Sequence, residues 1–187
     1  MADDPDLGLV LALQSGDESA LRALMARHQE AVFRFLFRYT RNESTARDLA
    51  QETFVRAYFK IARFEPRARF GTWLHQIALN LARDHSRSKH VRRELLHAPL
   101  EEGGQFTASG LDDPRRRAER LDRLQTVQAA IDSLPEDLKG ALILTALEGM
   151  SHEEAAVIME TTPKGIEGRI YRARNLLKEA AGLRARG

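Results

Sequence analysis

Residues 151–178, SHEEAAVIMETTPKGIEGRIYRARNLLK, constrain the fold of this chain more than any other segment. Ser151 with Glu154 three residues later is a capping-box pattern, which predicts that a helix begins at this point. Thr162 followed by Pro163 predicts the start of a second helix, because threonine is a good N-cap residue and proline is tolerated at the first helical position. Two short helices joined by so tight a connection are typical of a helix-turn-helix.

The second of these helices has one apolar face and one cationic face. Its apolar residues recur at helical spacing: Ile166, Ile170, Ala173 and Leu177. The basic residues lie largely off this stripe: Lys164, Arg169, Arg172, Arg174 and Lys178. A helix that packs its apolar face on a partner and presents cations to solvent fits the major groove of DNA. The alternative is an ordinary surface helix whose cations complement the carboxyl end of the helix dipole.

The amino-acid composition excludes several classes of protein. The 187 residues can hold one large domain or two small ones, and a hydrophobic content of 43% is enough for a folded core. No apolar run approaches the length of a membrane span, and the acidic amino terminus has the wrong charge for a signal or transit peptide. The absence of cysteine excludes disulfides and thiolate metal sites. We therefore expect a soluble, cytoplasmic protein.

The charges are distributed unevenly, although the net charge is only +2. Between residues 60 and 93 only Glu65 and Asp84 oppose a run of bases: Lys60, Arg63, Arg67, Arg69, Arg83, Arg87, Lys89, Arg92 and Arg93. The helix that follows Pro163 is a second basic region. Two separate cationic segments on a nearly neutral chain indicate two contacts with one polyanion such as DNA. A pair of solvated charged faces is the alternative.

The pattern along the chain predicts an all-α fold of two small helical domains joined by a flexible linker. Helical periodicity is strong, and strand-like alternation is not sustained anywhere. Helices are predicted at these positions before the helix-turn-helix: 7–14, 18–39, 46–61, from 72 onward, 115–133 and 136–149. Proline, glycine and serine replace the periodicity after residue 94, as in a linker. The predicted division is a first domain over 1–93, a linker over 94–114 and a helix-turn-helix domain over 115–187.

Several sequence blocks carry a resemblance to a known family. The blocks DLAQETFVRAY (48–58), RFGTWL (69–74) and IALNLARD (77–84) resemble region two of bacterial sigma factors. Residues 134–174, with LEGMSHEEAA at 147–156, resemble region four. A chain with these two regions and without regions one or three is similar to the extracytoplasmic-function group of alternative sigma factors. The resemblance implies a factor that binds core RNA polymerase, recognises and melts specific promoters, initiates transcription and is held in check by an anti-sigma factor.

The resemblance implies that the DLAQE helix binds the coiled coil of the clamp in the largest polymerase subunit. The candidate residues for this contact are Asp48, Gln51, Glu52 and Arg56. They fall near one helical stripe, at spacings of three or four, and offer both charge signs. Such a stripe fits a polar, reversible protein interface. A solvated helix surface is the alternative.

The resemblance also implies that the next helix and the loop before it bind the minus-ten promoter element. Melting a duplex requires the capture of an unstacked base, and each stacked base contributes about 1–3 kcal/mol. The candidate residues are Phe64, Arg67, Arg69, Asn80, Arg83, Asp84 and Arg87. Phe70 and Trp73 lie within an apolar stripe, so we expect them to pack in the core rather than against a base.

In the second domain the resemblance implies contacts with the minus-thirty-five element. The candidates are Lys164, Glu167, Arg169, Arg172 and Arg174. Three residues depart from the common pattern of the family, because Glu160 replaces the usual turn glycine, Glu167 replaces a lysine or arginine and Gly168 replaces a serine. Glutamate cannot contact phosphate favourably, but it can accept a hydrogen bond from cytosine N4. Glu167 therefore either reads a base or faces away from the DNA.

No catalytic residue, metal site or cofactor is expected, because the histidines are scattered and no glycine-rich phosphate loop is present. The sequence leaves three alternative functions. The first is a sigma-like decoy that binds only an anti-sigma factor. The second is an autonomous helix-turn-helix regulator, which would have to dimerise, and the third is a DNA recombinase, for which nucleophilic residues are lacking. The expected partners are core RNA polymerase, promoter DNA and an anti-sigma factor. We expect no obligate homo-oligomer and no membrane contact, except through a membrane-bound anti-sigma factor.

Overall fold

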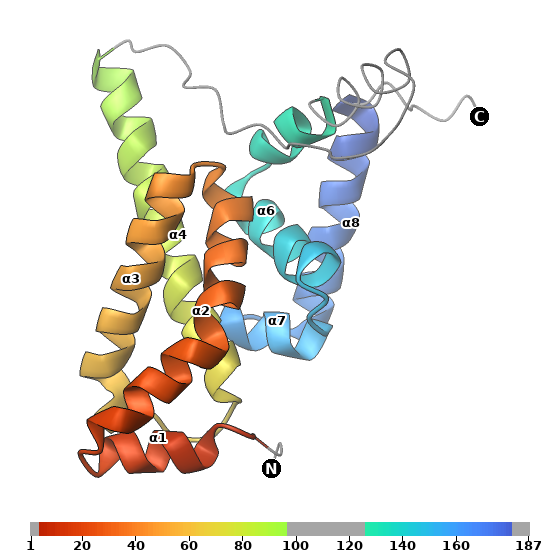
Figure 1. The fold of residues 1–187 in the computed structure, drawn as a ribbon. Coiled ribbons are helices and arrows are strands. Elements are labelled where there is room, and N and C mark those ends of the chain that lie inside the picture. The colour runs from red at the N-terminus through yellow and green to blue at the C-terminus, as the bar shows by residue number, and fades with distance from the viewer. Residues whose placement is uncertain (1–3, 97–125, 181–187) are drawn as a thin grey trace, which may run out of the picture.

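The computed structural model describes residues 4–96 and 126–180, and all regular secondary structure in these two stretches is helical (Figure 1). The all-α prediction is thus confirmed for the described residues. The predicted linker, 94–114, lies outside them, apart from residues 94–96, which continue the preceding helix; residues 115–125 of the second domain lie outside them too. No helix in the described stretches is both long enough and apolar enough to cross a membrane.

The first domain consists of four helices and one short turn of 3-10 helix. The elements are α1 (Leu7–Gln14), α2 (Glu18–Thr40), α3 (Glu43–Lys60), η1 (Ile61–Arg63) and α4 (Phe70–Leu96). Helices α2, α3 and α4 pack on one another, and α1 lies across their end near the amino terminus (Figure 1). Leu24, Phe35 and Leu74 are completely buried between them.

Two helix starts in this domain, those of α2 and α3, follow from local capping residues. The Asp17 carboxylate accepts a hydrogen bond from the backbone N–H of Ser19 at 2.9 Å, and the Asn42 side chain accepts one from the backbone N–H of Thr45 at 2.9 Å, so each of these helices has an N-cap within its own sequence. The start predicted at residue 72 is two residues late, because α4 begins at Phe70.

The second domain contains the predicted helix-turn-helix. After a helical stretch at residues 126–132 come α6 (Glu136–Leu142), the π-helical segment η2 (Ile143–Leu147), α7 (His152–Ile158) and α8 (Pro163–Ala180). The Ser151 hydroxyl accepts from the Glu154 backbone N–H at 3.1 Å, and the Glu154 carboxylate accepts from the Ser151 N–H at 3.0 Å. The Thr162 hydroxyl accepts from the Gly165 N–H at 3.0 Å. Both predicted helix starts are therefore confirmed.

The two domains pack directly on each other. Helix α7 lies against α4, and η2 lies against α2. Leu79 of α4 belongs to the same buried apolar cluster as Ile143, Ile158 and Met159 of the second domain. The hydrophobic core is therefore continuous across the two domains.

Polar contacts surround this apolar centre. Arg38 of α2 donates to the backbone carbonyl of Leu147 and forms an ion pair with Glu148 at 2.6 Å. The Tyr39 hydroxyl donates to the carboxylate of Glu136. These contacts join the end of α2 to both ends of the α6–η2 segment, so they fix how the second domain is oriented on the first.

Arg38→Ala should loosen the packing between the domains. The side chain of Glu148 is only 6% exposed, so loss of the guanidinium leaves a buried carboxylate without this partner, at a cost of about 1–3 kcal/mol. We expect a larger radius of gyration by small-angle X-ray scattering, with unchanged helix content by circular dichroism. Arg34→Ala is the matched control, because Arg34 lies one turn earlier and pairs with exposed Glu30 in its own helix. Equal radii for both variants would contradict this role of Arg38.

Candidate functional site

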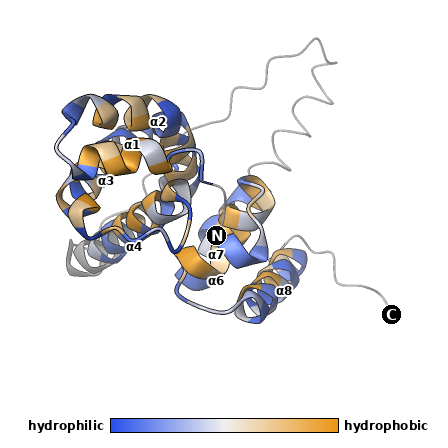
Figure 2. Ribbon diagram, turned by 90° about the horizontal axis from the view of Figure 1, so that it is seen from below, coloured by the Kyte–Doolittle hydropathy of each residue, from blue (hydrophilic) through white to orange (hydrophobic). Residues whose placement is uncertain are grey.

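Helix α8 presents the basic surface of the second domain. Its buried residues Ile166, Ile170 and Ala173 pack toward α6 and α7. Hydrophilic and hydrophobic patches alternate along α8, which lies on the side of the molecule away from the first domain (Figures 1 and 2). Four of the predicted minus-thirty-five residues are exposed: Lys164, Glu167, Arg172 and Arg174.

Arg169 is placed differently from the other four predicted residues. Its side chain is 22% exposed, and its guanidinium lies 3.7 Å from the carboxylate of Asp137 and 3.9 Å from the sulfur of Met159. Arg169 therefore contributes to packing between α8 and the rest of its domain in this arrangement.

The turn of the helix-turn-helix is built around Glu160. Its backbone is left-handed, with φ of 50°, a conformation that favours glycine. The N–H of Glu160 donates to the Val157 carbonyl at 3.3 Å and the N–H of Thr161 to the Ala156 carbonyl at 2.9 Å, which is a Schellman motif. The Glu160 carboxylate accepts a hydrogen bond from Gln76 of α4 at 2.8 Å. Glutamate at this turn thus makes a contact with the first domain that glycine cannot make.

The outward face of α8 also carries an aromatic residue that the sequence analysis missed. Tyr171 is 68% exposed, and it follows Lys164 and Gly168 at helical spacing on the side opposite the buried stripe. A Cβ added at Gly168 would meet no atom within 4 Å, so the surface is open at this position. Helical spacing alone, applied to uncharged residues as well as to cations, would have identified Tyr171.

Gly168→Ala should stabilise the chain by about 0.5–1 kcal/mol, because alanine lowers the conformational entropy of the unfolded state and the open surface accepts its methyl group. Gly165→Ala is the matched comparison in the same helix. There a Cβ would lie 2.7 Å from the Thr161 hydroxyl oxygen and 3.3 Å from that of Thr162, which caps α8. We expect urea denaturation to show stabilisation for Gly168→Ala and none for Gly165→Ala. An equal increase in the free energy of unfolding for both variants would show that a Cβ at residue 165 does not clash with Thr161.

Helix α3 presents the predicted protein-binding stripe at the edge of the first domain farthest from α8 (Figure 1). Asp48, Gln51 and Arg56 are exposed, and the half-buried Glu52 accepts a hydrogen bond from Arg56 Nε at 2.7 Å.

The structure extends this stripe with two apolar residues. Val55 and Phe59 follow Gln51 at intervals of four residues and are 42% and 78% exposed. A large apolar side chain left in solvent beside charged residues is typical of a protein interface. Phe59 was not among the predicted residues, because the charged and polar residues of the stripe do not indicate which apolar residues stay exposed.

The loop between η1 and α4 exposes arginines and buries its aromatic residue. The Arg67 side chain is 86% exposed and pairs with Glu65 at 2.7 Å, and Arg69 is exposed too. Phe64 is only 7% exposed; its ring centroid lies 5.0 Å from that of Trp73 and 6.2 Å from that of Phe70.

In this arrangement the Phe64 ring is buried against Trp73 and Phe70, so it is not available for stacking on a base. The expectation that Phe70 and Trp73 pack in the core is confirmed, since Phe70 is 2% exposed and Trp73 is half-buried against the core.

Helix α4 carries the remaining predicted minus-ten residues. Asn80, Asp84 and Arg87 are exposed, and Arg87 lies 3.5 Å from the Asp84 carboxylate. Arg83 is half-buried and points to the second domain, where its Nη2 would lie 3.8 Å from a Cβ on Gly140.

Arg83 also lies beside Tyr39 at the domain contact. Burial, followed by the hydrogen-bonded Glu136 carboxylate, raises the pKa of the Tyr39 hydroxyl above its usual range, and the Arg83 guanidinium opposes this shift. Tyr39 therefore stays protonated and donates to Glu136. Within the described stretches, no group of three or more histidine, aspartate or glutamate residues could hold a metal ion.

Two family models match the chain: Sigma-70 region 2 over residues 24–92, and Sigma-70, region 4 over residues 124–177. The RNA polymerase sigma-H factor of Pseudomonas aeruginosa is 31% identical over 184 residues, which cover 96% of this chain and 95% of that protein. The chain belongs to the sigma-70 family. The ECF RNA polymerase sigma-E factor of Haemophilus influenzae is 33% identical over 178 residues, 92% of this chain and 93% of that protein. The predicted extracytoplasmic-function group is thereby confirmed.

Solved structures of sigma factors have the same fold. CnrH, in complex with the cytosolic domain of CnrY, matches with a TM-score of 0.70 and 30% identity, covering 97% of this chain and all of that one. The sigma factor RpoE of Bartonella quintana, in complex with the anti-sigma factor NepR, matches in fold with a TM-score of 0.67, covering 87% of this chain and 96% of that one. As a sigma factor, the chain binds core RNA polymerase, recognises and melts promoters and initiates transcription. The family is one of initiation factors, and neither model describes an enzyme.

Proposed function

We propose that this sigma factor contacts polymerase through α3, the minus-ten element through the loop 64–69 and α4, and the minus-thirty-five element through α8. The observation that carries this assignment is the separation of three chemically distinct exposed surfaces. Helix α3 exposes a mixed polar and apolar stripe, the loop and α4 expose arginines beside polar residues, and α8 exposes a basic face at the other side of the molecule (Figure 1). One polymerase contact and two DNA contacts account for all three.

The polymerase contact would be centred on Phe59. Interfaces draw most of their affinity from a few large side chains surrounded by polar residues. Phe59 and Val55 supply the apolar part of the stripe, and Asp48, Gln51 and Arg56 supply the charged and polar part. The polar part would fix the register and partner, while the phenylalanine would supply the buried area.

The promoter contacts would be made in both domains at once. The exposed guanidiniums of Arg67 and Arg69 suit phosphates beside a melted base, and Lys164, Arg172 and Arg174 suit the major groove. Because the chain joins the two domains, binding of one raises the effective concentration of the other at its own element. We assign residues 1–93 and 115–187 to the two domains, with the linker between them.

An anti-sigma factor is the proposed regulator. The CnrH structure contains the cytosolic domain of CnrY, and the RpoE structure contains an anti-sigma factor. In this chain, Gln76 of α4 contacts the second domain and Arg83 lies beside it, and both share a helical face with Asn80 and Arg87. The packed arrangement thus occupies part of the face proposed for promoter DNA, and an anti-sigma factor that favours this arrangement would keep the protein inactive.

The proposed location, chemistry and regulation of the protein follow from its role as a sigma factor. The protein works in the cytoplasm, where polymerase and chromosome are found, and it performs no catalysis, since the chemistry of RNA synthesis belongs to the polymerase. Signals such as stress would reach it through the anti-sigma factor.

Run-off transcription with purified core RNA polymerase tests the proposal. The template is the DNA upstream of the protein's own gene, together with a genomic library of promoter fragments. We expect a transcript with a defined start site that is absent with core enzyme alone. Failure to bind core polymerase at all would contradict the proposal and favour the decoy function.

Asp48→Arg should abolish association with core polymerase and leave the fold intact, because charge reversal at an exposed position costs a folded domain little but opposes a complementary interface. Co-elution with core enzyme in gel filtration measures this. Glu30→Arg is the control, since Glu30 is an exposed helical residue outside the stripe. Co-elution of Asp48→Arg at wild-type level would show that the stripe is misassigned.

Arg172→Ala should weaken promoter binding by about 1–3 kcal/mol if the side chain reads a base. Arg172→Lys separates the two modes of contact, because lysine retains a phosphate contact but loses the bidentate guanine contact. Binding to matched and mutated minus-thirty-five fragments over a range of salt concentrations measures both. If Arg172 contacts a base, both variants should lose the preference for the matched over the mutated fragment. If it contacts a phosphate, the affinity of the alanine variant alone should depend less on salt concentration. Unchanged binding in both would exclude this face of α8.

A further inference from the structure

The loop proposed to capture a minus-ten base is tied at its entry to the amino-terminal segment. The side-chain amide of Gln14, at the end of α1, donates to the backbone carbonyl of Ile61 at 2.8 Å and to that of Phe64 at 3.0 Å. These carbonyls belong to η1 and to the residue after it, where the chain leaves its helix. One side chain therefore fixes the point from which the loop departs.

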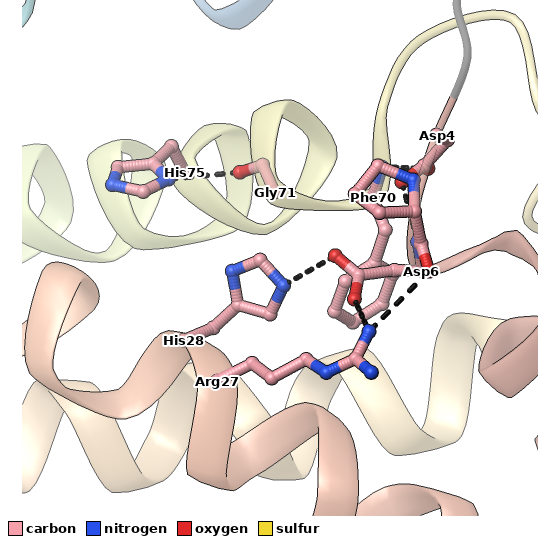
Figure 3. A network of polar contacts seen from close by, with 8 residues as sticks. Asp4, Asp6, Arg27, His28, Phe70, Gly71 and His75 are labelled. Atoms are coloured by element: carbon pink, nitrogen blue, oxygen red, sulfur yellow. Dashed lines mark hydrogen bonds and ion pairs between the residues drawn. The ribbon is translucent and has the colours of Figure 1, made fainter.

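The exit of the same loop is tied to the same segment. One oxygen of the Asp4 carboxylate accepts from the backbone N–H of Phe70, the first residue of α4, at 2.7 Å (Figure 3). The other oxygen accepts from the N–H of Asp6 at 2.9 Å. Asp4 thus takes the place of a local N-cap at α4 and adds a negative charge where the helix dipole favours one.

Asp6 holds this segment on α2, as Figure 3 shows. Its carboxylate accepts from Arg27 Nη1 at 2.7 Å and from His28 Nε2 at 2.7 Å. Burial alone would raise the pKa of the Asp6 carboxyl, but the hydrogen bonds from Arg27 and His28 outweigh it, and the pKa lies below its usual value. The His28 ring in turn packs edge-on against Phe70 at 5.4 Å. Charge-assisted hydrogen bonds that Asp6 accepts from α2 therefore hold the amino-terminal segment in place.

We propose that residues 4–14 are a brace that preorganises the loop 64–69 for base capture, with Gln14 and Asp4 as its positioning residues. The inference rests on the proposed minus-ten role of this loop. The brace fixes both ends of the loop, while Arg67 and Arg69 between them stay exposed to reach DNA. A loop whose ends are already ordered loses less conformational entropy when it closes on a base, and that saving appears as affinity.

The experiment uses the full chain bound to core polymerase and a fluorescent single-stranded oligonucleotide that carries the non-template minus-ten sequence of a promoter mapped by run-off transcription. Gln14→Met keeps the length of the side chain but loses its donors, and Asp4→Ala loses the acceptor. We expect the double variant to bind the oligonucleotide about tenfold more weakly, since each of the two substitutions should lower the affinity about threefold. Affinity for core polymerase and for a double-stranded minus-thirty-five fragment should not change.

Two control variants separate positioning from general stability. Asp4→Asn retains an acceptor for the Phe70 N–H and should bind almost as wild type. Asp17→Ala removes the cap of α2, an ordinary helix cap in the same domain that does not contact the loop, and should bind the oligonucleotide as wild type. A parallel fall in core-polymerase affinity and oligonucleotide affinity would mean that the brace only stabilises the domain, which would overturn the inference.

Arg69→Ala distinguishes failure of the inference from failure of the proposed function. If Arg69→Ala weakens oligonucleotide binding and the double variant of Gln14 and Asp4 does not, the loop assignment stands and the brace is wrong. If wild type and Arg69→Ala bind equally, the loop is not the minus-ten site, and the inference falls with it.

Discussion

The small size of the second domain makes its packing on α4 the contact on which the rest of the arrangement depends. A domain of about 60 residues buries only about 60% of the surface that its unfolded chain exposes and is marginally stable alone. The described part of the second domain, residues 126–180, is of this size. Leu134, Leu138, Leu142 and Ala173 form a small cluster between α6 and α8, whereas Ile143, Ile158 and Met159 join the larger cluster that includes Leu79. Burial against α4 therefore supplies a large part of the apolar core of the helix-turn-helix.

The polar contacts around this core decide the orientation of the domains. Apolar contacts are not directional, whereas the Arg38–Glu148 ion pair and the Tyr39–Glu136 hydrogen bond are satisfied in one geometry. Glu160 adds a third contact, to Gln76, from a left-handed backbone position that glycine would occupy without strain. Glu160 therefore costs local backbone strain in the turn and contributes a contact that holds the domains together.

Local sequence patterns predicted the parts of the fold that depend on local interactions. The caps at Asp17, Asn42, Ser151 and Thr162 act within three residues, so they could be read from the sequence, and the helix-turn-helix followed from two of them. The start of α4 could not be read in this way, because its cap, Asp4, lies 66 residues earlier in the chain.

The candidate site residues also divide into those that local sequence patterns could identify and those that depend on packing between elements. Charge and helical spacing identified the exposed faces of α3 and α8. They did not show that Phe64 packs inward, that Arg83 lies beside the second domain or that Phe59 is left in solvent. Each of these depends on which elements pack together, and one element's periodicity does not contain that information. The α3 and α8 roles, and the minus-ten loop, remain predictions about this sigma factor.

Helix α4 contacts both the amino-terminal segment and the second domain, and it also carries candidate minus-ten residues. Its first residue is tied to the amino-terminal brace, its middle packs on α7, and its exposed residues include Asn80, Asp84 and Arg87. Gln76, Asn80, Arg83 and Arg87 are spaced by three or four residues, so they lie on one face. Because the second domain contacts Gln76 and lies beside Arg83, DNA that lay along the whole of this face would collide with it. If α4 binds the minus-ten element as proposed, promoter DNA and the second domain compete for this face, and separation of the domains would free it. The basic face of α8 is already exposed in the packed arrangement.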